Sequence, residues 1–114
     1  MTTILELNDG NFTETIKEGI TLVDFWAPWC APCRMQGPIV EKVAQQVGAD
    51  VTIAKVNVDE ARQAAMDLGI RAIPTVIVFK EGQQAEQFVG VTDEYTLLNA
   101  IENVLVLSKS YENE

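Results

Sequence analysis

Histidine is absent from this chain of 114 residues, and cysteine occurs only twice, at Cys30 and Cys33. A structural zinc site takes four ligands, usually cysteine and histidine, so one chain offers only half of such a site. A metal shared between the cysteine pairs of two chains is an alternative that this ligand count disfavours, and we expect no metal. A cysteine hydrolase needs a base that is normally histidine, so that class of enzyme is close to excluded.

Basic residues are also scarce: 8 lysines and arginines stand against 17 aspartates and glutamates, which gives a net charge of −9. Nucleic acids and anionic membranes bind basic surfaces, so neither is an expected partner. No apolar run approaches the ~20 residues that span a bilayer, and the start MTTILELNDG lacks the features of a signal peptide. We expect a monomer in the cytoplasm, where a reducing environment disfavours a permanent disulfide.

The hydrophobic fraction of 47% indicates a globular chain, and its length suits a single domain. We expect this domain to cover residues 1–107 and a short tail, SKSYENE, to cover residues 108–114. Within the domain, strand and helix patterns alternate. The expected strands cover residues 3–7, 20–27, 50–58, 74–80 and 84–90. The expected helices lie within 8–19, over 32–47, over 60–68 and after residue 92.

This order of elements determines the expected fold class. Each strand–helix–strand unit implies parallel strands with a right-handed crossover. The short connection over 81–83 implies that the last two strands form an antiparallel hairpin. The fold class is therefore α/β, with a mixed central sheet and helices on both of its faces.

Local signals predict the ends and buried faces of the helices. Asp59 and Thr92 are expected to cap the helices that follow them. Pro32 suits a first helical turn, where a missing N–H costs nothing, whereas Pro38 lies inside the same helix and should kink it. The apolar positions of this helix recur every four residues, at Met35, Ile39, Val43 and Val47.

The cysteine pair lies where a buried strand leads into a helix. Cys30 stands at the N-terminal edge of the helix, where free N–H groups and the helix dipole favour a thiolate. Cys33 follows one turn later with its side chain directed back toward Cys30, and we expect it to be more buried and less ionised. Two unequal thiols at this spacing permit a two-step exchange, in which Cys30 attacks a disulfide and Cys33 then releases the product.

The segment VDFWAPWCAPCRM, residues 23–35, resembles the active-site segment of the thioredoxin family. The resemblance continues through AKVNVDE, GIRAIPTVIVFKEGQ and FVGV, and it covers residues 4–107. It implies the thioredoxin fold and a protein-disulfide reductase that cycles between dithiol and disulfide. The chain shows no nucleotide-binding glycine motif, so we expect no cofactor and a redox carrier that depends on a thioredoxin reductase for electrons. Disulfide-containing proteins are the expected substrates.

Asp24 is a carboxylate in the middle of a strand that is apolar on both faces. A buried carboxylate is costly unless it is paired or protonated. An ion pair with Lys55 on the next parallel strand would satisfy it, and a proton acceptor with a raised pKa near the buried thiol is the functional reading. The two are compatible. The resemblance implies that Asp24 helps to deprotonate Cys33.

The resemblance also implies a substrate-binding rim around the dithiol. It places Trp29 on the substrate-facing surface and makes the Ile73-Pro74 bond cis, with Ile73 binding the backbone of a peptide substrate much as an added strand would. Val89 and Gly90 match an apolar rim, although Gly90 could equally end a strand. Tryptophan at position 26 is instead expected to pack in the core.

The chain departs from the family pattern between its cysteines, where Ala31-Pro32 replaces the common pair Gly-Pro. Ala31 adds a methyl group at the substrate-facing rim. Because the dipeptide between the cysteines influences the reduction potential in related proteins, the sequence does not fix that potential. Arg34 stands where lysine is common, and Gln36 has no explanation from the sequence. Two rival functions remain: a disulfide oxidant or isomerase with a similar fold, and a binding subunit without turnover.

Overall fold

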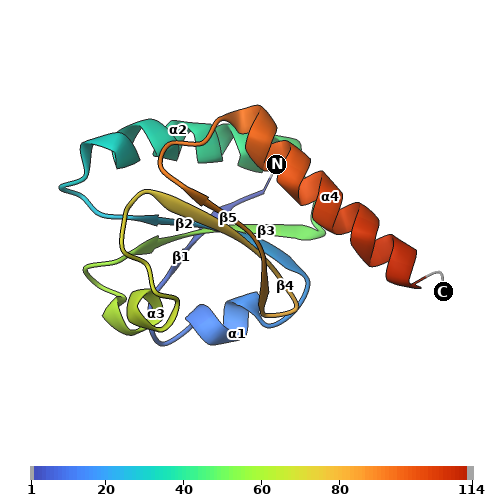
Figure 1. Ribbon diagram of the computed structural model, residues 1–114, viewed down its shortest axis with the longest axis horizontal. Coiled ribbons are helices and arrows are strands. Elements are labelled where there is room, and N and C mark those ends of the chain that lie inside the picture. Colours follow the sequence, from blue (N-terminus) through green and yellow to red (C-terminus); the bar gives the residue numbers. More distant parts are fainter. Residues whose placement is uncertain (1, 113–114) are drawn as a thin grey trace.

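The computed structural model describes residues 2–112 and contains a central five-stranded sheet between two layers of helix (Figure 1). The strands are β1 (Ile4–Leu7), β2 (Ile20–Trp26), β3 (Val51–Asn57), β4 (Thr75–Lys80) and β5 (Gln83–Val89). The helices are α1 (Phe12–Ile16), α2 (Ala31–Gln46), α3 (Arg62–Asp67) and α4 (Glu94–Glu112). Their order along the chain confirms the predicted alternation.

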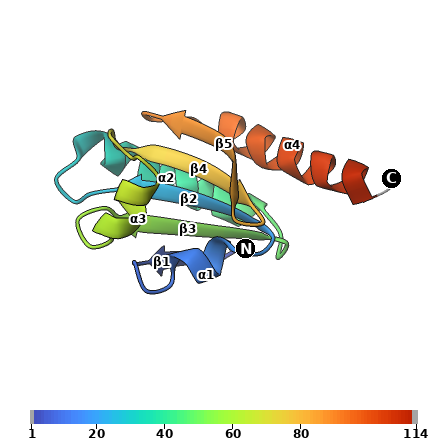
Figure 2. The same ribbon diagram turned by 60° about the horizontal axis from the view of Figure 1, so that its bottom comes forward.

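The strands lie in the spatial order β1-β3-β2-β4-β5, so that β1 and β5 form opposite edges (Figure 2). The first three are parallel to one another, whereas β4 is antiparallel to both β2 and β5. The hairpin between β4 and β5 turns through Glu81 and Gly82, which both have positive φ (50° and 82°), as a two-residue hairpin turn requires. The mixed sheet of the predicted fold class is thereby confirmed.

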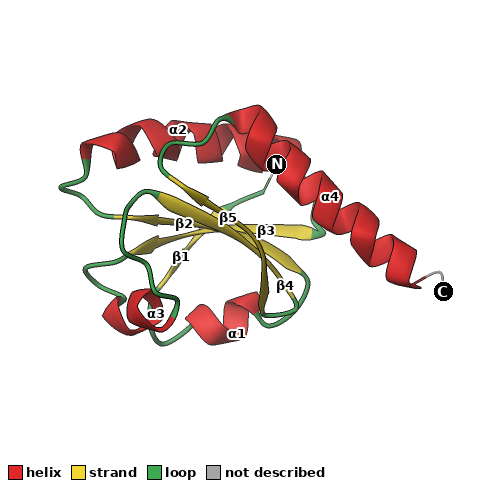
Figure 3. Cartoon of the chain, viewed as in Figure 1, coloured by secondary structure: helices red, strands yellow, loops and turns green. Residues whose placement is uncertain are grey.

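Each face of the sheet carries its own hydrophobic core, because successive side chains of a strand point to opposite faces. Leu22 of β2 packs with residues of α2 and α4 on one face. Val23 and Phe25 pack with residues of α1 and α3 on the other. Figure 3 shows these two helix pairs on either side of the strands. Strand β2 is thus covered on both faces.

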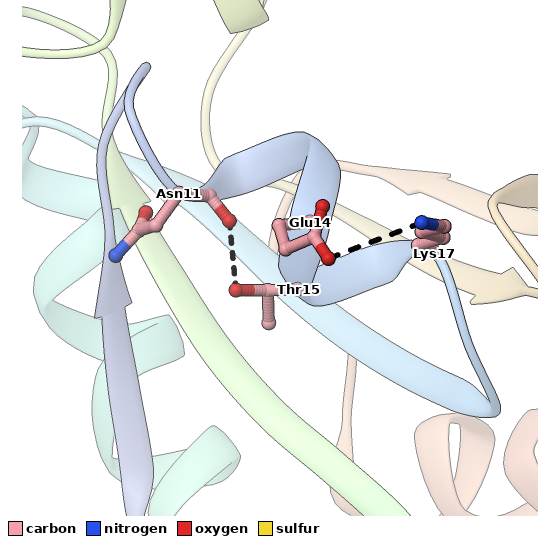
Figure 4. A network of polar contacts seen from close by, with 4 residues as sticks. All are labelled: Asn11, Glu14, Thr15 and Lys17. Carbon is pink, nitrogen blue, oxygen red and sulfur yellow. Dashed lines mark hydrogen bonds and ion pairs between the residues drawn. The ribbon is translucent and has the colours of Figure 1, made fainter.

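Helix α1 has only five residues, so packing rather than helix propensity holds it in place. The Phe12 ring lies 6.1 Å from that of Phe25 and 5.8 Å from that of Phe79. On its polar side, the Thr15 hydroxyl donates to the Asn11 carbonyl at 2.8 Å, and Lys17 lies 3.9 Å from Glu14 (Figure 4).

Both predicted helix caps are wrong. Helix α3 begins after Ala61 without a side-chain cap of its own; Asp9, from the loop after β1, instead accepts hydrogen bonds from the backbone N–H groups of Gln63 (3.2 Å) and Ala64 (2.9 Å). Helix α4 is capped by Asp93 rather than Thr92. The Thr96 N–H donates to the Asp93 carboxylate at 2.8 Å, and this bond lowers the pKa of Asp93.

The apolar repeat of α2 coincides only in part with the buried face of the helix. Val43 is buried, but Met35 is 64% exposed, and Gln36 beside it is fully buried. The buried residues are 33, 36, 40, 43 and 44, because a helix of 3.6 residues per turn keeps one face with spacings of three and four. A strict spacing of four rotates away from that face.

The last helix continues to Glu112, past the position at which we expected the domain to end, and it extends beyond the sheet (Figure 1). The division at residue 107 stays a prediction, and residues 113–114 of the expected tail lie outside the described residues. Among residues 2–112, no helix combines the length and apolarity that a membrane crossing requires.

We predict that Asp9→Ala lowers the free energy of unfolding by about 1 kcal/mol, because it leaves two amide groups of α3 without their acceptor. Urea unfolding measures this change. Asp67→Ala, at the other end of the same helix, removes only an exposed bond to Gln63 and should cost less than about 0.5 kcal/mol. Equal effects of the two substitutions would contradict the capping role of Asp9.

Candidate active site

The two cysteines form a disulfide at the junction of β2 and α2, with 5.3 Å between their Cα atoms. Cys30 is the N-cap of α2, and its backbone is extended (φ −92°, ψ 107°). The Cys33 N–H donates to the Cys30 sulfur at 3.2 Å. Both residues are 5% exposed, so the expectation that Cys33 is the more buried is not met in the disulfide form. The bond places both sulfurs in one cluster with Ala27.

The start of α2 favours negative charge on the Cys30 sulfur. Pro32 occupies the first helical turn, where it has no N–H to leave unsatisfied. The Cys33 N–H, a free donor of that turn, points at Cys30 instead. Arg34 donates to the Pro28 carbonyl at 3.3 Å and so ties the preceding loop to the helix. A thiolate at Cys30 would therefore meet a fixed donor and the positive end of the dipole.

Asp24 lies in β2, two residues before the strand ends, and is 3% exposed. Burial raises the pKa of its carboxyl from 3.8 to about 7, and the positive charge of Lys55 opposes this rise. One carboxyl oxygen, Oδ1, is buried without a hydrogen-bond partner. Asp24 is therefore a group that exchanges a proton near neutral pH.

Lys55 is the register partner of Asp24 on β3, but its ion pair is with Glu6 of β1, at 3.4 Å. Its ammonium group also lies 5.4 Å from the centre of the Trp26 ring, which packs partly buried at the end of β2. The expected direct pair with Asp24 is thus replaced by a longer-range charge effect, because Glu6 competes for the same cation.

A pocket of about 370 Å³ connects Asp24 with Cys33. Lys55 and Arg34 also line it. The pocket is large enough for water and has several polar groups that could bind it. It provides a route by which a proton could pass between the carboxyl and the second cysteine, which are not in direct hydrogen-bond contact.

The residues expected to form the rim gather around the dithiol. Trp29 is 68% exposed, and its indole N–H donates to Asp59 at 2.9 Å, so Asp59 orients the ring rather than capping α3. The Ile73-Pro74 bond is cis, and the Cys30 sulfur lies 3.7 Å from the Ile73 carbonyl oxygen. Ala31 is exposed beside the disulfide, at the first position of α2.

Gly90 joins this rim through the backbone. Its N–H donates to the Pro74 carbonyl at 2.8 Å, and its φ of 91° is a conformation that favours glycine. The preceding Val89 ends β5 with an exposed side chain. Gly90 is therefore both the strand-end glycine and a neighbour of the cis-proline loop.

Sequence reasoning missed two members of this region, Asp59 as the partner of Trp29 and Gln36 as the partner of Thr92. The sequence signal for Gln36 was its amide side chain on a helix face whose other positions, such as Val40 and Val43, are apolar. Among the side chains that the structure describes, those of residues 2–107, no group of three or more His, Cys, Asp or Glu is arranged to hold a metal ion.

A family model described as Thioredoxin matches residues 3–103. The chain belongs to the thioredoxin family. Thioredoxin 1 of Synechococcus elongatus is 42% identical over 107 residues, which cover 92% of this chain and all of the relative. The thioredoxin of Bacillus subtilis is 41% identical over 87 residues, or 76% of this chain and 84% of the relative. A solved structure of a thioredoxin from Malassezia sympodialis has a TM-score of 0.80 and 37% identity, covering 90% of this chain and 91% of its own.

These matches confirm the resemblance and the thioredoxin fold. Together with the disulfide between Cys30 and Cys33, they show a thiol–disulfide oxidoreductase of the thioredoxin family. Proteins of this family work with disulfide substrates.

We predict that Asp24→Asn stabilises the protein at pH 8 and not at pH 4. Because the pKa of about 7 lies above the ordinary 3.8, folded protein keeps a proton that unfolded protein releases between these values. The stability of the parent protein therefore falls as pH rises from about 4 through 7. At about 1.4 kcal/mol per pH unit, the variant should gain on the order of 4 kcal/mol above pH 7.

Urea unfolding of both proteins at pH 4, 6 and 8 measures this difference. Asp50→Asn, in an exposed turn, is the control and should change stability little at any pH. A constant difference across the three pH values would show that Asp24 does not titrate in this range.

Proposed function

We propose that the protein reduces disulfides in other proteins, with Cys30 as the attacking thiol and Cys33 as the resolving thiol. The carrying observation is that the Cys30 sulfur lies at the N-terminus of α2, accepts the Cys33 N–H and adjoins the Ile73 carbonyl on the rim. The helix N-terminus and the Cys33 N–H lower the free energy of a thiolate at Cys30, and the position beside Ile73 brings it to the surface that a protein substrate would meet.

The exchange transfers two electrons in two steps. The Cys30 thiolate attacks one sulfur of the substrate disulfide, so that the substrate S–S bond breaks and a mixed disulfide forms. The leaving sulfur departs as a thiolate and takes a proton from solvent. Cys33 then loses its proton and attacks the Cys30 sulfur, which releases the second substrate thiolate. The substrate is reduced to a dithiol, and the protein is oxidised to the Cys30–Cys33 disulfide.

Asp24 is proposed to accept the proton of Cys33 in the second step, through water in the pocket that they share. Burial gives its carboxyl a pKa of about 7, near that required of a base at neutral pH. Lys55 supports this role because its charge opposes a still larger rise of that pKa, which keeps the carboxylate accessible.

The rim is proposed to hold the substrate chain. Trp29 and Ala31 are exposed on either side of Cys30, and Val89 is exposed at the end of β5, opposite Thr75; all three offer apolar contacts. The backbone of Ile73, which precedes Pro74, lies beside Cys30. An extended segment of the substrate that pairs with this backbone would bring its disulfide to the Cys30 sulfur. Pro32 supports the site by shaping the first turn of α2.

A thioredoxin reductase is proposed to return the protein to its dithiol form, which places the cycle in a reducing compartment such as the cytoplasm. We propose that the working unit is a monomer, because one chain contributes both cysteines, Asp24 and the rim. No role for nucleic acid or membrane is proposed, given the net charge of −9.

Cys30→Ser should abolish the acceleration that the protein gives to insulin reduction by dithiothreitol, and should form no mixed disulfide. Cys33→Ser should also lose turnover but accumulate a mixed disulfide through Cys30, which mass spectrometry of the intact protein detects. The two variants are each other's controls, because each removes one sulfur of the pair. Trapping through Cys33 in the first variant would reverse the assigned order.

The reduction potential separates the reductase from an oxidant with the same fold. Reference potentials are about −270 mV for thioredoxin and about −120 mV for a strongly oxidising disulfide catalyst. We expect equilibration with dithiothreitol buffers to give a value near the former. A value near the latter would favour an oxidant or isomerase, and a binding subunit would show a normal potential without turnover of insulin.

A further inference from the structure

Gln36 is a fully buried polar side chain that the proposed exchange does not use. It lies on α2 one turn after Cys33. Both ends of its amide are bound to the backbone of one residue: the Thr92 N–H donates to Oε1 at 2.8 Å, and Nε2 donates to the Thr92 carbonyl at 3.0 Å. This reciprocal pair resembles the one that two residues on neighbouring strands make.

Thr92 belongs to the segment over residues 90–93, which joins β5 to α4 and which we call the rim segment. The segment is fixed at its start by the bond from Gly90 to the Pro74 carbonyl, and at its end by Asp93, which caps α4. Within it, the Thr92 hydroxyl donates to the Gly90 carbonyl at 3.1 Å. Gln36 joins the middle of the rim segment to the helix that carries the dithiol.

These contacts close a ring around the active site. Its members, in order, are Cys30, Ile73, Pro74, Gly90, Thr92, Gln36 and Cys33, and the disulfide completes it. The exposed side chains of Val89 and Val91 flank Gly90 in this ring. Their position relative to the two sulfurs is therefore set from both sides, by the cis-proline loop and by Gln36.

We propose that Gln36 is a positioning residue for protein substrates, and that its amide holds the rim segment in place relative to the dithiol. This inference rests on the proposed reductase function. A protein substrate that lies across the rim segment meets a surface that is already ordered, so its binding avoids the entropy cost of fixing that loop. A small disulfide reaches the sulfurs without covering the rim and gains nothing from this order.

The test compares Gln36→Met with the parent protein, because methionine has a similar shape and lacks the amide. The reduced proteins are mixed with oxidised insulin and, separately, with hydroxyethyl disulfide, and the second-order rate constants are measured. We expect the constant for insulin to fall roughly threefold to tenfold, which corresponds to low-end net contributions from the two hydrogen bonds that the substitution removes. The constant for hydroxyethyl disulfide should stay within about twofold.

Val43→Ala is the matched control, since Val43 is buried on the same helix and makes no hydrogen bond to the rim segment. It should lower stability by leaving a cavity, but keep the parental ratio of the two rate constants. Hydrogen exchange of the Thr92 amide gives a second readout and should become faster in Gln36→Met while amides of β3 keep their protection.

Each result of this comparison decides between alternatives. Equal losses with both disulfides would place the effect of Gln36 on the thiols themselves, and unchanged constants would reduce it to a packing residue; either overturns the proposal. If the parent protein reduces neither disulfide, the reductase function itself fails. Faster exchange at Thr92 with an unchanged ratio of rate constants would overturn only the role of Gln36 in substrate positioning.

Discussion

Strand β2 pairs with neighbours along both edges and is covered on both faces, and the active site depends on this double burial. Its residues 20–25 are all buried between β3 and β4. A strand packed in this way cannot shift its register without exposing one core and burying polar backbone. Its end at Trp26 is therefore a fixed point from which the loop to Cys30 and helix α2 begin. The position of the dithiol is therefore fixed by β2, the central strand of the sheet.

The same burial gives Asp24 its chemical character and its energetic cost. On its face of β2 the carboxyl group follows Leu22, which is part of a hydrophobic core. Ionisation there destabilises the folded chain, so a group that serves exchange at neutral pH weakens the fold at that pH. Lys55 and the pocket beside Cys33 limit how far Asp24 departs from ordinary carboxyl behaviour, since the positive charge of Lys55 opposes the rise of the pKa and the pocket has room for water. Function and stability are opposed at this one residue.

Much of the fold could be predicted from the sequence because its signals are local. Apolar residues on both faces of β2 and β3 mark buried strands, and the pair Glu81-Gly82 marks a hairpin. The predicted cap of α3 is wrong because the acceptor that serves this helix is Asp9, which is 54 and 55 residues from the amides it binds. A rule that inspects neighbours along the chain cannot find such a partner.

The residues of the candidate site also differ in whether local sequence signals predict them. Cys30 and Cys33 could be recognised because their spacing and their place at a helix start are adjacent in sequence, and Asp24 because a carboxyl inside an apolar strand needs a reason. No local sequence signal predicts that Ile73 lies beside Cys30. Only the family resemblance predicted this contact.

Gln36 shows why some contacts cannot be predicted from the sequence at all. Its partner is the backbone of Thr92, 56 residues away, and a backbone partner places no demand on residue type. The sequence therefore shows only one of the two partners of such a contact. That partner is a polar residue at a helix position where the pattern predicts an apolar one. An amide at a buried helical position is therefore best read as evidence of a distant backbone segment, and the structure is needed to say which one.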